Sequence, residues 1–215
     1  MSELLRITEI FLSLQGESNT TGLPTVFVRL TGCPLRCVYC DTAYAFSGGE
    51  MQKVKDIVQK VMSYDIRYVT VTGGEPLAQE GCLDLMADLC NEKLNVSVET
   101  SGAMDISKVD PRVVKVMDLK TPDSGEVHRN LYSNLELLNS TDQIKFVICS
   151  HDDYEWSKQK IAEHKLTDKV CEVLMSASHG ALESRELAEW ILRDRLNVRL
   201  QIQLHKYLWG DKPGV

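Results

Sequence analysis

The sequence predicts an α/β protein built on mostly parallel strands. Short β-branched runs alternate with segments of helical periodicity along all 215 residues, and no linker or repeat divides them. Strands joined through helices pair in parallel by right-handed crossovers. Six or seven such strands would form an open twisted sheet or an incomplete (β/α) barrel. Either architecture places ligands at the carboxyl ends of the strands.

The individual elements follow from the spacing of apolar residues. In chain order, the strand candidates are 26–30, 67–71, 95–99, 113–117, 144–148, 170–174 and 198–202. The helix candidates are 51–62, 78–91, a segment from about residue 152, and 181–194. The connection between the third and fourth strands is short, and 121–140 fits neither pattern.

Composition excludes several classes of protein. The formal net charge is −7 and no block of basic residues is present, which argues against a protein that binds duplex nucleic acid directly. No apolar run is long enough to span a membrane. With no secretory signal, the seven cysteines are expected to be reduced thiols of a cytoplasmic protein.

Three of these cysteines form a compact motif. Cys33, Cys37 and Cys40 have the spacing C-x3-C-x2-C, with no fourth cysteine close behind. Three thiolates on one loop can hold three irons of a [4Fe–4S] cluster and leave the fourth iron open to a small molecule. A structural zinc site usually needs four ligands, and a disulfide cluster does not suit a chain of this length without a signal peptide. The other cysteines stand singly and are expected to pack in the core, namely Cys82, Cys90, Cys149 and Cys171.

Polar and glycine-rich segments follow the first four predicted strands directly. They are 32–41, 72–76, 99–102 and 118–120. Because the carboxyl ends of parallel strands meet at one rim, these segments are expected to surround a single site.

The cysteine motif and the turn Gly73-Gly74-Glu75-Pro76, which follows the next predicted strand, together resemble the radical S-adenosylmethionine (SAM) superfamily. The resemblance covers nearly the whole chain and implies an incomplete (β/α)6-type partial TIM barrel. It also implies that the cluster's open iron binds the amino and carboxylate groups of SAM, while the glycine turn holds the methionyl amino group.

The two ends of the chain are similar to one family within this superfamily, the 7-carboxy-7-deazaguanine synthases. The similarity lies in 11–17, Gly22-Leu23-Pro24, 26–30, Asp41-Thr42 and the ending 203–210. It implies a carbon–nitrogen lyase that converts 6-carboxy-5,6,7,8-tetrahydropterin to 7-carboxy-7-deazaguanine with ring contraction and loss of ammonia. This reaction belongs to queuosine biosynthesis, a tRNA modification pathway.

Residue types fit a pterin substrate. A carboxylate and an amide, Glu17 and Gln15, suit the 2-amino-4-oxo edge, and Arg29 can grip a substrate carboxylate with its planar fork. The alternative for Arg29 is a buried structural ion pair. The full set of substrate-binding residues that the resemblance implies is Leu14, Gln15, Gly16, Glu17, Arg29, Thr72, His205 and the terminal carboxylate of Val215.

The resemblance also implies the cofactor contacts. Those expected for SAM are Tyr39, Cys40, Asp41, Gly74, Glu75, Ser101, Asp118, Lys120 and Ser176. Asp118-Leu119-Lys120 stands where the family often has Ser-Pro-Lys, and Ser176, like Ser178, suits a turn equally well. Thr42 resembles the family's Mg²⁺ ligand and is otherwise a helix cap. No side chain is expected to carry out the chemistry itself, which belongs to the cluster and SAM.

The resemblance further implies a single domain over 1–215 with N- and C-terminal substrate-binding extensions. A reducing electron donor such as a flavodoxin and a homodimeric state are expected as well. Two alternatives stay open at this point: a radical SAM activase acting on a partner protein, and a non-enzymatic metal-binding interaction protein with zinc in the cysteine loop.

Overall fold

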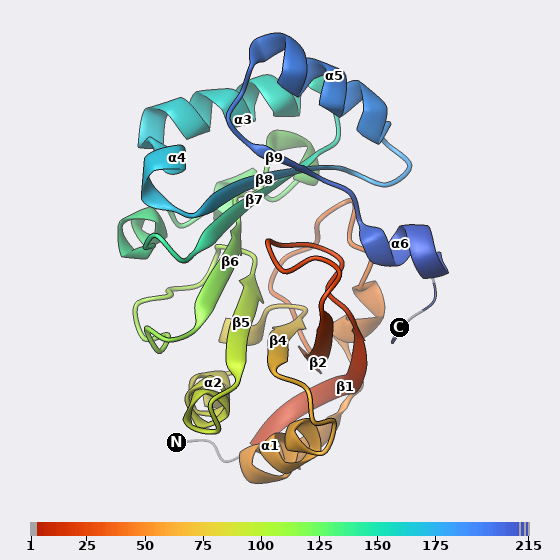
Figure 1. The fold of residues 1–215 in the computed structure, drawn as a ribbon, viewed down its shortest axis with the longest axis vertical. Coiled ribbons are helices and arrows are strands. Elements are labelled where there is room, and N and C mark those ends of the chain that lie inside the picture. Colours follow the sequence, from red (N-terminus) through yellow and green to blue (C-terminus); the bar gives the residue numbers. More distant parts are fainter. Residues whose placement is uncertain (1–3, 211, 213, 215) are drawn as a thin grey trace.

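The computed structural model describes residues 4–210, 212 and 214. In this part of the chain a nine-stranded sheet has the order β3-β1-β2-β4-β5-β6-β7-β8-β9 (Figure 1). Its strands are β1 (Leu4–Leu14), β2 (Pro24–Leu30), β3 (Glu50–Lys53), β4 (Tyr68–Gly73), β5 (Asn95–Thr100), β6 (Val114–Asp118), β7 (Gln143–Ile148), β8 (Glu172–Ala177) and β9 (Arg199–Gln201).

Pairing is parallel from β2 through β4 to β9 and antiparallel only where β1 joins β2 and β3. The two edges, β3 and β9, do not pair with each other, so the sheet stays open. The predicted α/β fold with an incomplete barrel of mostly parallel strands is therefore confirmed.

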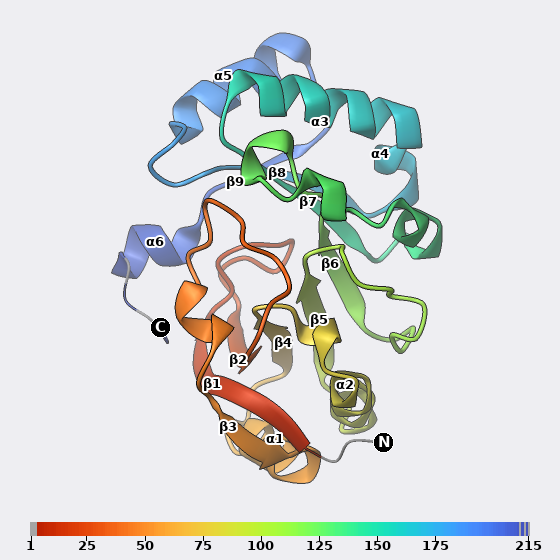
Figure 2. The same cartoon turned by 180° about the vertical axis from the view of Figure 1, so that it is seen from behind.

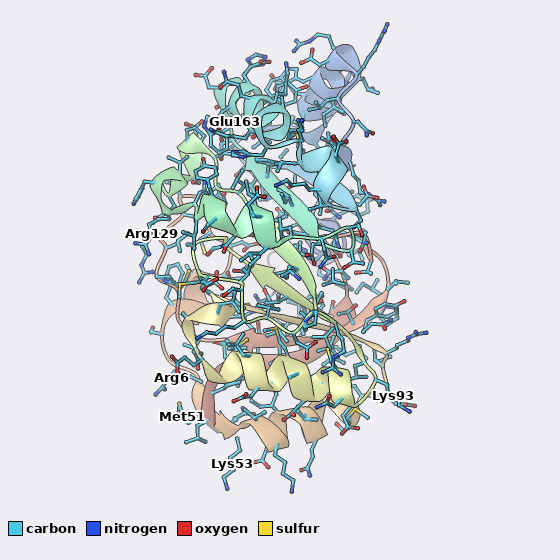
Figure 3. All side chains as sticks on the ribbon, turned by 90° about the vertical axis from the view of Figure 1, so that its left-hand side faces the viewer. Arg6, Met51, Lys53, Lys93, Arg129 and Glu163 are labelled. Atoms are coloured by element: carbon cyan, nitrogen blue, oxygen red, sulfur yellow. The ribbon has the colours of Figure 1, made fainter. Side chains whose placement is uncertain are left out.

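Most helices lie along the outer, convex face of this sheet. They are α1 (Val54–Met62), α2 (Gly81–Asn91), α3 (His151–His164), α4 (Leu166–Lys169) and α5 (Ser184–Asp194). Helix α6 (Leu204–Trp209) lies instead on the concave side, where His205 and Lys206 line a cavity. Figure 2 shows α1 and α2 at the end that carries β1 to β5, and α3 to α5 at the end that carries β7 to β9. From the side, Met51 and Lys53 lie at the surface near α1 (Figure 3). Among the described residues, none of the helices combines the length and apolar character needed to cross a bilayer.

Two strands escaped the sequence prediction. Leu4–Leu14 forms β1, and residues 51–53, expected to begin a helix, belong to β3, so α1 starts only at Val54. Met51 fits the apolar spacing of the helix, but Leu4–Ile7 offers a strand edge to which Glu50–Lys53 pairs. The ambiguous segment 121–140 contains three short 3₁₀ turns, Pro122–Ser124, Val127–Arg129 and Tyr132–Leu137.

Residues alternate along each strand between the helix layer and the opposite, concave face. In β2, Val26, Val28 and Leu30 are buried in the core with the helices. Their neighbours Phe27 and Arg29 face the other way, toward the cavity. The concave face also carries polar residues from the neighbouring strands, namely Thr70, Thr72, Ser97, Glu99, Asp118 and Lys145. This alternation builds the site.

Candidate active site

A cavity of about 410 Å³ lies on the concave face, at the carboxyl ends of β2 and β4 to β7. The segment that follows β1 and helix α6 contribute to its wall. Residues more than 170 positions apart in the sequence therefore face one space. A concave pocket lined by convergent polar groups is the usual form of an enzyme site.

The cysteine loop forms one wall of the cavity. Cys33, Cys37 and Cys40 all line it, and none is in a disulfide. Burial raises the pKa of the Cys33 and Cys37 thiols, whereas the nearby Lys120 ammonium opposes the shift. Three unpaired thiols on one wall, next to a cation that favours thiolate, suit the ligands of a [4Fe–4S] cluster.

Among the described residues, no three or more His, Cys, Asp or Glu side chains are grouped around a single metal-ion position. In a [4Fe–4S] cluster each thiolate binds a different iron, so its cysteines do not need to converge on one point.

Glycine turn 73–74 packs directly beneath the cysteine loop. A Cβ on Gly74 would overlap the carbonyl oxygen of Gly32 and lie 2.8 Å from Cβ of Cys33. Gly73 has φ +155°, and a Cβ there would lie 2.8 Å from the amide nitrogen of Leu30. The close approach explains why this turn needs two residues without side chains.

Glu75 holds this turn in place from inside the protein. Its fully buried carboxylate accepts hydrogen bonds from the Leu77 amide (3.0 Å), the Thr100 hydroxyl (3.0 Å) and the Ser101 amide (2.7 Å). These bonds connect the turn to the end of β5. The structure thus does not bring the Glu75 carboxylate to the cavity, where the sequence led us to expect a contact with SAM.

Gln15 organises the segment after β1. Its Nε2 donates to Thr70 Oγ1 (3.0 Å) and to Glu99 Oε1 (3.3 Å), and its Oε1 accepts from the Glu17 amide (3.0 Å). The amide is almost completely buried. Gln15 therefore uses most of its hydrogen-bonding capacity to fix the backbone that presents Glu17.

The Glu17 carboxylate is ionised by a buried lysine. Lys145 Nζ donates to Glu17 Oε2 (2.7 Å), and Gln203 Nε2 donates to Oε1 (2.8 Å). Burial opposes ionisation of Glu17, but the charge of Lys145 and the hydrogen bonds from Lys145 and Gln203 together outweigh burial and lower the pKa of the carboxyl. The same ammonium lies 3.4 Å from Asp118 Oδ1, and Asp118 Oδ2 accepts from Lys120 Nζ (2.5 Å).

Two atoms of the cavity wall lack a hydrogen-bond partner among the described residues. They are the Tyr39 hydroxyl and Asp118 Oδ1, both buried. Asp118 Oδ1 still faces the Lys145 ammonium at 3.4 Å, so within the described part of the chain only the Tyr39 hydroxyl is without any polar neighbour of this kind. Buried polar atoms normally have partners, so this hydroxyl beside the cysteine loop suits a polar ligand in this half of the cavity.

Glu99, on β5, lies between these charged groups. Its Oε2 accepts from the Thr72 hydroxyl (3.0 Å). Burial raises the pKa of Glu99, and the neighbouring Glu17 carboxylate adds to the rise, although Lys145 opposes it. The site therefore contains one carboxyl that favours the ionised form and a second that resists ionisation.

Helix α6 closes the cavity over the Gln15–Glu17 segment. The Leu204 amide donates to Gly16 O (3.2 Å), and a Cβ on Gly16 would overlap the His205 ring. Burial opposes ionisation of Asp41, but a hydrogen bond from His205 and the charge of Lys206 lower its pKa. The expected role of the Val215 carboxylate concerns a residue outside the described part of the chain.

Most of the expected site residues line the cavity. They are Leu14, Gln15, Gly16, Glu17, Arg29, Thr72 and His205 for the substrate, and Tyr39, Cys40, Asp41, Gly74, Ser101, Asp118 and Lys120 for SAM, with Thr42 for Mg²⁺. Glu75 and Ser176 do not line it. Ser176 is 2% exposed within β8, whereas Ser178, beyond the strand end, reaches the cavity. These roles remain predictions.

Sequence reasoning missed several residues of the wall. Tyr44 and Lys145 were missed altogether, whereas Phe11, Glu99 and Gln203 lie in the singled-out segments 11–17, 99–102 and 203–210 but were not named as site residues. Lys145 carried a usable signal, since it is a charged residue between apolar neighbours in a parallel strand. Tyr44 lies outside the strands and carried no such signal.

Comparison with known proteins identifies the family of the chain. The family model for the Radical SAM superfamily matches residues 27–119, which run from β2 to just beyond β6. This part of the chain is thus a radical SAM domain. A 7-carboxy-7-deazaguanine synthase of Chlorobaculum tepidum is 46% identical over 98% of this chain and 97% of its own length. The same enzyme of Koribacter versatilis is 42% identical over 95% and 97%.

Among solved structures, the crystal structure of QueE from Escherichia coli matches with a TM-score of 0.78 and 26% identity, covering 93% of this chain and 94% of that chain. The chain belongs to the 7-carboxy-7-deazaguanine synthase family. The resemblance inferred from the sequence is confirmed, and these relatives favour neither the activase nor the zinc-binding alternative.

Proposed function

We propose that this chain converts 6-carboxy-5,6,7,8-tetrahydropterin to 7-carboxy-7-deazaguanine, with loss of ammonia. The observation that carries the proposal is a single cavity. It joins the three-cysteine wall to Glu17 and Arg29, which suit the two polar ends of a carboxylated pterin. Relatives that match nearly the full length of the chain carry the name of this activity.

The cysteines and the glycine turn would hold the cluster and SAM. When bound, these groups supply the 5′-deoxyadenosyl radical that takes a hydrogen from the substrate C6. On the same side, the Tyr39 hydroxyl is a hydrogen-bond donor without a partner among the described residues. Asp118 offers a carboxylate there that is ion-paired with Lys120 and Lys145. The chain's own task is to bind both molecules, orient them and exclude water.

On the substrate side, each group has a distinct task. The ionised Glu17 accepts from the donor edge of the pterin, supported by Lys145 and Gln203. Arg29 binds the carboxylate at the opposite end of the substrate. The N- and C-terminal segments, through Gln15–Glu17 and α6, act as the substrate-binding extensions of the domain.

Thr42 is the proposed Mg²⁺ ligand. It occupies the N-cap position of the 3₁₀ turn Ala43–Phe46, yet its hydroxyl makes no capping hydrogen bond. The hydroxyl lies 3.8 Å from Cys40 Sγ and lines the cavity. Among the described residues, its one hydrogen-bond contact is this weak one to sulfur, so the oxygen can still bind Mg²⁺, with substrate oxygens and waters as the other ligands.

The proposal extends to partners. A one-electron donor such as a flavodoxin would reduce the cluster, and the chain would act as a homodimer. Seven cysteines free of disulfides fit a reducing compartment such as the cytoplasm.

Turnover under anaerobic conditions tests the function. Reconstituted protein with SAM, Mg²⁺, a reductant and 6-carboxytetrahydropterin should form 7-carboxy-7-deazaguanine. Tetrahydropterin without the carboxylate should give no deazapurine. Production of 5′-deoxyadenosine only in the presence of a partner protein, and never with the pterin, would instead support an activase.

A further inference from the structure

We propose that Glu9 and Tyr44 are positioning residues for Arg29: together they aim its guanidinium so that the two Nη nitrogens bind the substrate carboxylate. The proposal rests on the proposed function, because it concerns how Arg29 selects a pterin that carries a carboxylate.

Glu9 and Arg29 face each other across the first two strands. They are register partners in the antiparallel pair β1–β2, next to an irregularity between Ile7 and Glu9. Arg29 Nε donates to Glu9 Oε1 at 2.7 Å, and both side chains are largely buried, with 14% and 22% exposed. This bond fixes one edge of the guanidinium.

The opposite edge of Arg29 is left for a ligand. Arg29 lines the cavity, and neither of its Nη nitrogens has a hydrogen-bond partner among the described residues. A guanidinium held through Nε presents its two Nη groups as a fork, which matches the two oxygens of a carboxylate.

Aromatic rings restrain the plane of the guanidinium. Its central carbon lies 5.8 Å from the Phe11 ring centre and 5.9 Å from that of Tyr44. Phe11 itself stacks on Phe27 at 5.2 Å, so this platform is rigid. Arginine has several rotatable bonds, and fixing them before the ligand arrives lowers the entropic cost of binding.

Tyr44 holds the Glu9 carboxylate, which in turn orients Arg29. Its hydroxyl donates to the same Glu9 Oε1 at 2.7 Å. Burial, together with the Glu9 carboxylate, raises the pKa of Tyr44 to about 12 although Arg29 opposes the rise, so the hydroxyl remains a donor at neutral pH. Glu9 therefore receives two hydrogen bonds on one oxygen, and its orientation is defined from both sides.

The charge of Glu9 argues for positioning rather than for attraction. An anion next to Arg29 weakens the electrostatic attraction between Arg29 and a substrate carboxylate. Any benefit of Glu9 to binding must therefore come from the orientation that it gives to the guanidinium. Glutamine at this position keeps an oxygen acceptor for Arg29 and Tyr44 but removes the charge. Alanine removes both the acceptor and the charge.

Binding to two pterins separates these effects. The dissociation constants of 6-carboxytetrahydropterin and of tetrahydropterin without the carboxylate are measured on the SAM-loaded, reconstituted protein. The variants are Glu9→Ala, Glu9→Gln and Tyr44→Phe, with Glu172→Gln as the control. Glu172 accepts from Arg199 Nη2 at 2.7 Å, so it forms a similar Glu–Arg pair between β8 and β9, and neither residue lines the cavity.

Glu9→Ala should weaken binding of the carboxylated pterin by about tenfold or more, the effect of a hydrogen bond to a charged group. Binding of the pterin without the carboxylate should not change. Glu9→Gln should keep most of the wild-type affinity for the carboxylated pterin. Tyr44→Phe should lose affinity for the carboxylated pterin only, and less of it than Glu9→Ala does. Glu172→Gln should bind both pterins as wild type does.

Iron content and circular dichroism confirm that each variant is folded. If Glu9→Ala retains the wild-type preference for the carboxylated pterin, or loses affinity for both pterins equally, the positioning role is wrong while the proposed function stands. A wild-type protein that binds neither pterin would overturn the proposed function, and this inference with it.

Discussion

Lys145 Nζ lies 2.7 Å from Glu17 Oε2, so a buried ammonium on β7 ionises the carboxylate presented after β1. The same nitrogen lies 3.4 Å from Asp118 Oδ1. Burial lowers the affinity of Lys145 for its proton, but Asp118 and Glu17 outweigh that effect and raise its pKa well above the ordinary value. Lys145 thus forms ion pairs both with Glu17, on the proposed substrate side of the cavity, and with Asp118, on the proposed SAM side.

Lys145→Met should destabilise the protein and weaken binding of both ligands. Removal of one partner leaves buried carboxylates without compensation, which costs roughly 3–5 kcal/mol in the free energy of unfolding. Denaturant unfolding and the dissociation constants of SAM and pterin measure these effects. The double variant Lys145→Met/Glu17→Gln should recover part of the stability. Lys169→Met, which breaks the exposed pair with Glu136, should change little.

Glu99→Gln should stabilise the protein relative to wild type above about pH 4.5. The pKa of Glu99 is raised in the folded state, so its contribution to stability is full below the ordinary value of 4.5 and falls as the pH rises. The difference in unfolding temperature between variant and wild type should therefore grow from pH 4.5 upward. A constant difference across this range would contradict the assignment.

Asp118→Asn should show the opposite dependence. Burial opposes ionisation of Asp118, but Lys120 and Lys145 lower its pKa below the ordinary 3.8, so its stabilising contribution is present above that value and is lost in acid. The variant should be less stable than wild type at neutral pH. This deficit should shrink as the pH falls through 3.8, which thermal unfolding at several pH values would reveal.

Cys37→Ala should abolish the cluster, because two thiolates then remain for a centre that needs three protein ligands. Cys171→Ala is the matched control, since that exposed cysteine directly precedes β8 and does not line the cavity. Iron and acid-labile sulfide are measured after anaerobic reconstitution. About four irons per chain in Cys37→Ala would refute the assignment of the cysteine loop.

Thr42→Ala should keep the cluster and SAM binding but lose the stimulation of turnover by Mg²⁺. Thr42→Ser, which retains a hydroxyl, should preserve most of it. Product formation is measured as a function of Mg²⁺ concentration. The same Mg²⁺ dependence in wild type and Thr42→Ala would show that the hydroxyl is not a ligand.

The sequence predicted the parallel part of the sheet well, because β-branched and apolar residues recur at every second position of these strands, on the face that packs against the helices. Glu50–Lys53 could not be predicted, because it is a strand only through its pairing with β1. Its apolar spacing alone continues the helix that follows.

For the site, motifs with fixed spacing were sufficient to place the cysteines, Gly74 and Glu17 at one cavity. The role of Glu75 could not be read from the motif, because its carboxylate is satisfied by Thr100 and Ser101, which belong to a different strand end. Likewise, the proposed role of Glu9 could not be predicted, because it depends on the strand register that places Glu9 opposite Arg29. Contacts that depend on register and tertiary packing leave no local signature.

The central claim is that the substrate C6 and the 5′ carbon of SAM meet in this cavity. The most direct test uses 6-carboxytetrahydropterin deuterated at C6, with mass analysis of the recovered SAM and 5′-deoxyadenosine after anaerobic turnover. Deuterium is expected on their 5′ carbon with the wild-type protein and not with Cys37→Ala. Formation of 7-carboxy-7-deazaguanine by wild type with no deuterium in either molecule would contradict it.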